Sequence, residues 1–104
     1  MPELRFEKVA RKGDVSPGQG LQVELGGRLM GLFNVDGRFY VIDNGCTHRG
    51  GPLSEGHLEG KEVICPWHAW RFDVTTGICD LDQTKVETYP VKVEGDDIYV
   101  GVPQ

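Results

Sequence analysis

Four side chains that can bind a soft metal stand in two short pairs near the middle of the chain. Cys46 and His48 form a C-x-H pair, and Cys65 and His68 form a C-x-x-H pair after a gap of sixteen residues. Such a donor set suits a structural zinc ion. It equally suits a 2Fe–2S cluster that has two Cys on one iron and two His on the other. The spacing therefore predicts one metal centre enclosed by two loops, with both ligand chemistries open.

The mixture of donors within each loop separates these two chemistries. Zinc fingers usually place two cysteines in one loop and two histidines in the other, on a short unit that ends in a helix. Here each loop carries one of each type, and no helical pattern follows the second pair. Mixed pairs let one metal take both thiolates while its neighbour takes both imidazoles. This arrangement favours an asymmetric two-iron cluster over zinc.

Composition limits the class of protein and its partners. The chain has 104 residues, with 11 Lys and Arg against 16 Asp and Glu, for a net charge of −5. We expect one domain over residues 1–104, able to bury roughly 65% of its extended-chain surface. An acidic surface argues against nucleic acid or an anionic membrane as partner. No apolar run approaches the length of a membrane span, and no apolar signal segment follows Met1, so a cytoplasmic monomer is expected.

Alternating apolar residues and turn signals predict an all-β fold, a small antiparallel sandwich or barrel. Asp36-Gly37 and residues 95–97 are hairpin turns between such strands. A cluster-binding subdomain, built from the two loops, is expected over about 44–80, a region poor in apolar side chains. Within it, His57 is interpreted as an exposed loop residue and Cys79 as a small core residue. Strands are expected over residues 4–10, 21–25, 29–35, 39–42, 63–64, 70–73, 78–79, 87–93 and 98–102, and one helical turn over 52–55.

The residues beside the ligands extend the pattern. R-G-G-P-L-S-E-G occupies positions 49–56, after the first pair, and W-R-F-D with a later T-G occupies positions 70–77, after the second. With these motifs the chain resembles Rieske proteins, and in detail the small Rieske ferredoxins of bacterial aromatic-ring dioxygenase systems. The resemblance covers most of the chain. It implies a Rieske-type fold and a Rieske-type 2Fe–2S cluster.

The resemblance also implies a role for each ligand. Cys46 and Cys65 would hold the inner iron, and His48 and His68 would hold the outer iron through Nδ1. The implied function is one-electron transfer from an NAD(P)H-dependent flavin reductase to a terminal ring-hydroxylating oxygenase. The chain would not be an enzyme by itself, since only His57 is left to serve an oxygenase iron. Two alternatives stay open: the small Rieske subunit of an assimilatory nitrite reductase, and a zinc-bound structural module.

Positions near the ligands predict a low reduction potential. High-potential Rieske proteins carry a disulfide between the two loops, at positions that here are Gly51 and Trp67. They also carry Ser and Tyr hydroxyls that donate to cluster sulfur, where this chain has Trp70 and Phe72. Hydrogen bonds to sulfur stabilise the more negative reduced cluster, so their absence lowers the potential. We expect a midpoint at the low end of the Rieske range, near about −150 mV.

Three smaller expectations concern the rim of the centre. Trp67 and Trp70 are interpreted as shielding aromatics, with partner docking as the alternative. Arg49 is a candidate for the docking rim. The family often covers its cluster with a third loop that contains proline, but residues 80–85 are polar and contain none.

Overall fold

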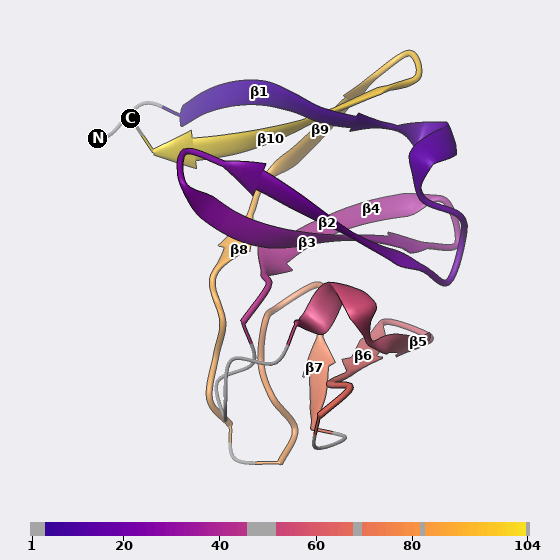
Figure 1. The fold of residues 1–104 in the computed structure, drawn as a ribbon, viewed down its shortest axis with the longest axis vertical. Helices are drawn as coiled ribbons and strands as arrows, with labels where there is room; N and C mark the ends of the chain where they lie inside the picture. Colours follow the sequence, from indigo (N-terminus) through magenta and orange to yellow (C-terminus); the bar gives the residue numbers. More distant parts are fainter. Residues whose placement is uncertain (1–3, 46–51, 68–69, 82, 104) are drawn as a thin grey trace.

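The computed structural model describes residues 4–45, 52–67, 70–81 and 83–103. This part of the chain consists of short antiparallel strands and two single-turn 3-10 helices, which confirms the all-β prediction (Figure 1). The strands are β1 (Leu4–Arg11), β2 (Gly20–Leu25), β3 (Arg28–Val35), β4 (Arg38–Asp43), β5 (His57–Glu59), β6 (Glu62–Ile64), β7 (Arg71–Asp73), β8 (Thr88–Tyr89), β9 (Val91–Glu94) and β10 (Asp97–Pro103), and the 3-10 helices are η1 (Lys12–Asp14) and η2 (Leu53–Glu55).

The strands form three sheets that lie one above another in Figure 1. The upper sheet has the order β1-β10-β9, the central sheet β2-β3-β4-β8, and the lower sheet β5-β6-β7. Every neighbouring pair is antiparallel. The lower sheet contains the strand that leads directly into Cys65, so the fold brings the second ligand pair to this end of the molecule.

Both faces of the central sheet are buried, which explains why β3 reads as an almost continuous apolar run. Met30 and Leu32 point into a core shared with the upper sheet, whereas Phe33 points into a core shared with the lower sheet. On β4, Val41 packs into the core shared with the upper sheet and Ile42 into the core shared with the lower sheet. The upper core comprises Ala10, Val15, Val23, Met30, Leu32, Val41, Tyr89, Ile98 and Val100. The lower core comprises Phe33, Ile42, Leu53, Leu58, Val63, Cys65, Phe72, Val74, Cys79 and Val86.

The predicted hairpin turns are confirmed. Asp36 and Gly37 both have positive φ, 51° and 90°, which is the geometry of the two-residue turn that matches strand twist. The β9–β10 hairpin turns through Gly95, at φ 59°. The helical turn expected over residues 52–55 is also present, as η2.

The structure differs from the predicted elements in three places. The single strand expected over 87–93 is divided at Pro90, which has no N–H to donate, so β8 joins the central sheet and β9 the upper one. Residues 57–59 form β5, a strand too short to show a pattern, so the placement of His57 in a loop was wrong although its exposure was right. Ile78 and Cys79 make isolated bridges to Lys85 and Phe72 instead of a strand.

The lower sheet has strands of only three residues, and charged side chains support their pairing. Arg71 on β7 forms ion pairs with Glu59 on β5, at 3.1 Å, and with Glu62 on β6, at 3.7 Å. These groups are substantially exposed, so solvent screens each pair and its contribution to stability is small. No helix in the described part of the chain is long and apolar enough to cross a membrane.

Candidate metal centre

Cys65 is the predicted ligand whose surroundings the structure describes. It follows β6 directly, is 2% exposed, and belongs to the lower core together with Leu53 and Phe72. Its backbone N–H donates to the carbonyl of Trp70 at 2.7 Å, which closes the base of the turn between β6 and β7. The thiol forms no disulfide. Cys65 is therefore a buried free thiol on a backbone fixed from both sides.

The other three predicted ligands, Cys46, His48 and His68, lie outside the described residues, as do Arg49 and Gly51. Among the residues that are described, no group of three or more His, Cys, Asp or Glu stands together. The structure therefore leaves the complete ligand set as a prediction. It does fix the backbone from which both predicted ligand pairs extend.

The two ends of the segment 46–51 are tied to each other. Gly45 and Pro52 form an isolated antiparallel bridge, and the N–H of Leu53 donates to the carbonyl of Asn44 at 2.7 Å. Leu53 itself is fully buried in the lower core. The first predicted pair therefore lies in a segment whose flanking residues, at the end of β4 and at the start of η2, are held together.

Gly56 allows η2 to approach the strand of the second pair closely. A methyl group at Gly56 would lie 2.2 Å from the carbonyl oxygen of Ile64 and 2.9 Å from Cγ2 of Val63. Ile64 directly precedes Cys65, so this contact fixes the distance between the return of the first loop and the start of the second. The N–H of Gly56 donates to the carbonyl of Leu53.

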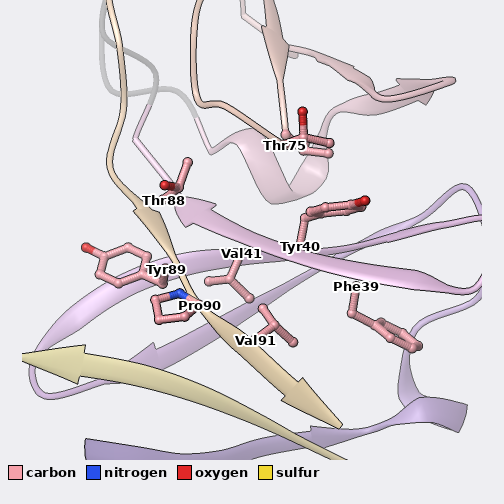
Figure 2. Close-up of a pocket in the computed structure, with 9 residues that line it drawn as sticks. Phe39, Tyr40, Val41, Thr75, Thr88, Tyr89, Pro90 and Val91 are labelled. Carbon is pink, nitrogen blue, oxygen red and sulfur yellow. The ribbon is translucent and has the colours of Figure 1, made fainter. Parts of the chain in front are cut away.

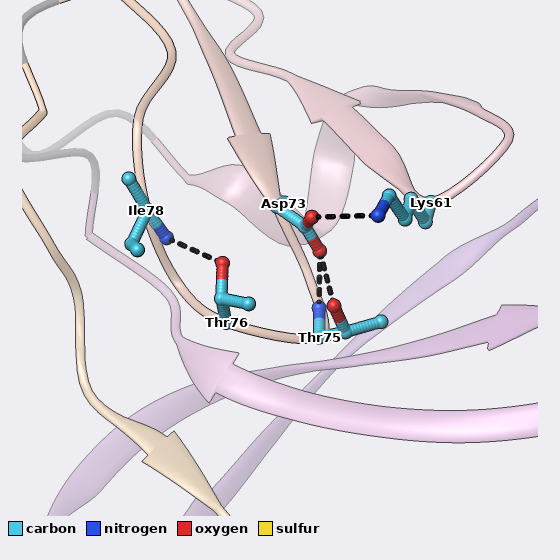
Figure 3. A network of polar contacts seen from close by, with 5 residues as sticks. All are labelled: Lys61, Asp73, Thr75, Thr76 and Ile78. Atoms are coloured by element: carbon cyan, nitrogen blue, oxygen red, sulfur yellow. Dashed lines mark hydrogen bonds and ion pairs between the residues drawn. The ribbon is translucent and has the colours of Figure 1, made fainter.

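The turn after β7 is held by a carboxylate. Asp73 accepts hydrogen bonds from both the backbone N–H, at 2.8 Å, and the hydroxyl of Thr75, and forms an ion pair with Lys61 at 3.3 Å (Figure 3). Desolvation raises the pKa of Asp73, but the hydrogen bonds from Thr75 and the ammonium group of Lys61 outweigh it and hold the pKa below its ordinary value. This turn joins the lower sheet to the segment that contains Cys79.

Cys79 is fully buried in the lower core, as predicted for a core residue. Beyond it, the polar loop 80–85 is closed by its own backbone. The N–H of Cys79 donates to the carbonyl of Thr84 at 2.8 Å, and the N–H of Gln83 donates to the carbonyl of Cys79 at 3.0 Å. Leu81 is 64% exposed on this loop. These two hydrogen bonds hold Gln83 and Thr84 against Cys79, at a place where the proteins that the chain resembles often have proline.

The aromatic residues of the second motif have different environments. Phe72 is completely buried in the lower core beside Cys65, and Trp70 packs against that core. Trp67 is 57% exposed. Burial thus supports a shielding role for Trp70, whereas exposure argues against a shielding role for Trp67. Phe72 places a ring without a hydroxyl beside the buried thiol.

The surroundings of Cys65 fit a metal–sulfide centre. A buried free thiol becomes a thiolate ligand when metal binds, and it is a soft donor. The hydroxyl of Ser54, on η2, is also buried and has no hydrogen-bond partner in the described part of the chain. A buried donor of this kind is costly unless a group that the structure does not contain accepts from it.

A surface pocket of about 450 Å³ lies elsewhere, between β4, β8 and the turn at Thr75 (Figure 2). Its lining contains neither cysteine nor histidine, so it offers no soft metal donor. The lining residues are Phe39, Tyr40, Val41, Val74, Thr75, Thr88, Tyr89, Pro90 and Val91.

Sequence reasoning missed the role of Asn44, and it included Gly56 in the glycine-rich motif without foreseeing its close approach to β6. Asn44 lies two residues before Cys46, and Gly56 ends the motif that follows the first pair. Their positions beside the motifs were the available signal. Their roles depend on contacts with strands distant in sequence, which no local pattern contains.

Comparison with known proteins places this geometry in a family. Residues 5–93 match the model of the Rieske [2Fe-2S] domain. The chain is 43% identical over 93 residues to the naphthalene 1,2-dioxygenase system ferredoxin component of Pseudomonas putida, covering 88% of this chain and 89% of that protein.

Solved structures agree. A chain in the complex of reduced oxygenase and oxidized ferredoxin in carbazole 1,9a-dioxygenase superposes with a TM-score of 0.83 at 31% identity, covering 91% of each chain. The putative NADH-dependent nitrite reductase small subunit from Mycobacterium tuberculosis superposes with a TM-score of 0.90, covering 98% of each chain, but at 24% identity this likeness concerns the fold alone.

Proposed function

This chain belongs to the Rieske [2Fe-2S] family, and from that premise we propose that it carries single electrons to a terminal ring-hydroxylating oxygenase. The donor that we propose is an NAD(P)H-dependent flavin reductase. The observation that carries the proposal is the 43% identity, over nearly the whole chain, to a dioxygenase ferredoxin component. The related chain in the carbazole dioxygenase complex of oxygenase and ferredoxin supports an oxygenase as the acceptor.

The cofactor is a Rieske-type 2Fe–2S cluster, and we propose Cys46, His48, Cys65 and His68 as its ligands. The cysteines would hold the inner iron and the histidines the outer iron. Support comes from the motif spacing and from the burial of Cys65 as a free thiol. Bound there, the cluster supplies one reversible electron, and its oxidised form is electrically neutral.

The protein's own residues position and insulate that centre. The lower core covers the side of Cys65 with apolar groups, Leu53 and Phe72 among them, and so excludes water. The bridge between Gly45 and Pro52 holds together the two residues that flank the segment of the first pair, and the close approach at Gly56 sets η2 against β6, which leads into Cys65. We propose that the chain transfers electrons without being an enzyme, and its similarity to a ferredoxin component of a dioxygenase system supports this.

We further propose that residues 1–104 form one domain, with the cluster-binding subdomain over about 44–80, and that the protein is a cytoplasmic monomer. The lower sheet and η2, which border both ligand pairs, lie within that subdomain range. A monomer suits a carrier that must leave the reductase before it meets the oxygenase. Analytical ultracentrifugation of the holoprotein tests this point directly.

Exchange of the ligands tests the assignment of the cluster. His48→Ala and Cys65→Ala should abolish the visible absorption of the cluster and its iron content. His57→Ala and Cys79→Ala are the matched controls, because they remove the same residue types from positions outside the proposed set. Full cluster content in either ligand variant would contradict the assignment.

Electron transfer is tested by reconstitution. The reduced holoprotein should reduce a ring-hydroxylating oxygenase at catalytic concentration, turning over many times for each molecule of carrier. The rival proposal is that the chain is a small subunit of a nitrite reductase. A protein with that description shares the fold, but the likeness extends no further. A stoichiometric complex that co-purifies with a nitrite reductase, and no transfer to an oxygenase, would favour that rival.

A further inference from the structure

A buried asparagine lies between strand β4 and the first predicted ligand. Asn44 follows β4, precedes Cys46 by two residues, and is 4% exposed. Its Oδ1 accepts from the N–H of Ser54 at 2.8 Å, and its Nδ2 donates to Oε1 of Gln22 at 2.9 Å. The side chain therefore joins β2 to η2 across the end of the central sheet.

The backbone of Asn44 also bonds to η2, and it bonds to β3 as well. Its N–H donates to the carbonyl of Leu29 at 3.1 Å, and its carbonyl accepts from Leu53 at 2.7 Å. Asn44 is thus bonded to three elements that are distant in sequence, and two of its bonds go to η2.

We propose that Asn44 is a positioning residue for the cluster, because it holds together the two ends of the segment that carries Cys46 and His48. This inference rests on the ligand set proposed above. Leu53 and Ser54 form the return of that segment, and Asn44 bonds the N–H of each. The amide oxygen bonds Ser54, two residues further along the return than Pro52, where the backbone bridge from Gly45 ends.

The physical reason lies in the cost of leaving Ser54 unpaired. Its N–H is buried, so removing the Oδ1 acceptor leaves a desolvated donor unpaired unless η2 moves to find water. Movement of η2 relative to β4 changes the span across the ligand segment. Metal centres respond to such shifts, because partners outside the ligand sphere set the orientation of the ligands.

The chain contains a matched control for this role. Asn34 is also 4% exposed, and its side chain also makes two hydrogen bonds, from Nδ2 to the carbonyl of Val15 at 2.9 Å and from the N–H of Gly37 to Oδ1 at 2.8 Å. It lies beside the turn of the β3–β4 hairpin, whereas Asn44 lies beyond the opposite end. Asn34→Ala and Asn44→Ala should therefore destabilise the fold alike and differ at the cluster.

The experiment measures loss of the cluster from the holoprotein to a chelator, well below the unfolding temperature. Asn44→Ala should lose its cluster about 10–100-fold faster than wild type, the usual consequence of removing a partner outside the ligand sphere. Asn34→Ala should lose it at the wild-type rate. Asn44→Asp keeps an oxygen acceptor for Ser54 and should restore the slow rate. Equal rates for the two alanine variants would overturn the proposal.

Gln22→Ala keeps the test decisive if Asn44→Ala does not fold. Gln22 is exposed, and its replacement removes the acceptor of the hydrogen bond that Asn44 Nδ2 donates. The control is Glu24→Ala, at an exposed position on the same strand. Faster cluster loss in the Gln22 variant alone supports the proposal, and equal rates overturn it. Wild-type protein without a cluster, or His48→Ala with one, would instead show that the proposed ligand set is wrong.

Discussion

Replacement of Gly56 by alanine tests the close approach that joins the two ligand loops. Gly56 has a φ of −76°, which any L residue adopts without strain, so the substitution changes packing and not backbone preference. The added methyl group would meet the carbonyl oxygen of Ile64 at 2.2 Å. That oxygen belongs to the backbone of β6, so it has no rotamer by which to withdraw.

The size of the effect follows from this distance. Ordinary van der Waals contact begins near 3.4 Å, so η2 and β6 must separate by about 1.2 Å. Overpacking of this kind costs about 1–3 kcal/mol. In a domain of this size each kcal/mol lowers the melting temperature by roughly 4–8 °C. Because Ile64 precedes Cys65, cluster content should fall together with stability.

Thermal unfolding of the holoprotein, followed by circular dichroism and by visible absorption, measures both consequences. Gly13→Ala is the control, because a methyl group there meets no atom within 4 Å and the φ of Gly13 is not positive. It should leave the melting temperature unchanged or raise it slightly. If Gly56→Ala has the same melting temperature as Gly13→Ala and keeps its cluster, the close contact between η2 and β6 is refuted.

Four further predictions concern three single side chains and the midpoint potential of the wild-type protein. Asp73 has a lowered pKa, so its carboxylate stabilises the fold above pH 3.8 and loses this effect as the pH falls through the folded-state pKa. Urea midpoints of Asp73→Asn should fall below wild type at neutral pH and converge with it in acid. Tyr89→Phe removes the hydroxyl that donates to Asp43 at 2.7 Å, and should cost about 1 kcal/mol in the same assay, with no change in cluster content. The wild-type midpoint potential should lie near about −150 mV, and a redox titration above about +100 mV would contradict the reasoning. Phe72→Tyr should raise the midpoint, by about 60 mV for each 1.4 kcal/mol by which the new hydrogen bond favours the reduced cluster.

The sequence determined the class of fold and the kind of centre. Alternation and turn residues are local signals, and they placed both hairpins and the helical turn of η2 correctly. Asp36-Gly37 is the clearest case, because few residues tolerate the positive φ that its turn requires. The paired Cys and His motifs named a cofactor that the family assignment supports.

Tertiary structure decided the layers and the contacts that position the centre. No pattern within β3 reveals that Met30 and Phe33 serve different cores, because a strand buried on both faces shows no alternation. The strand expected over 87–93 is divided at Pro90 because its first part pairs with the central sheet and its second part with the upper sheet. Asn44 matters through its contact with Ser54 on η2, and Gly56 through its contact with Ile64 on β6; only the folded chain brings these residues together. Ligand types are a property of local sequence, whereas the distance between two loops is a property of packing, and only the three-dimensional arrangement sets it.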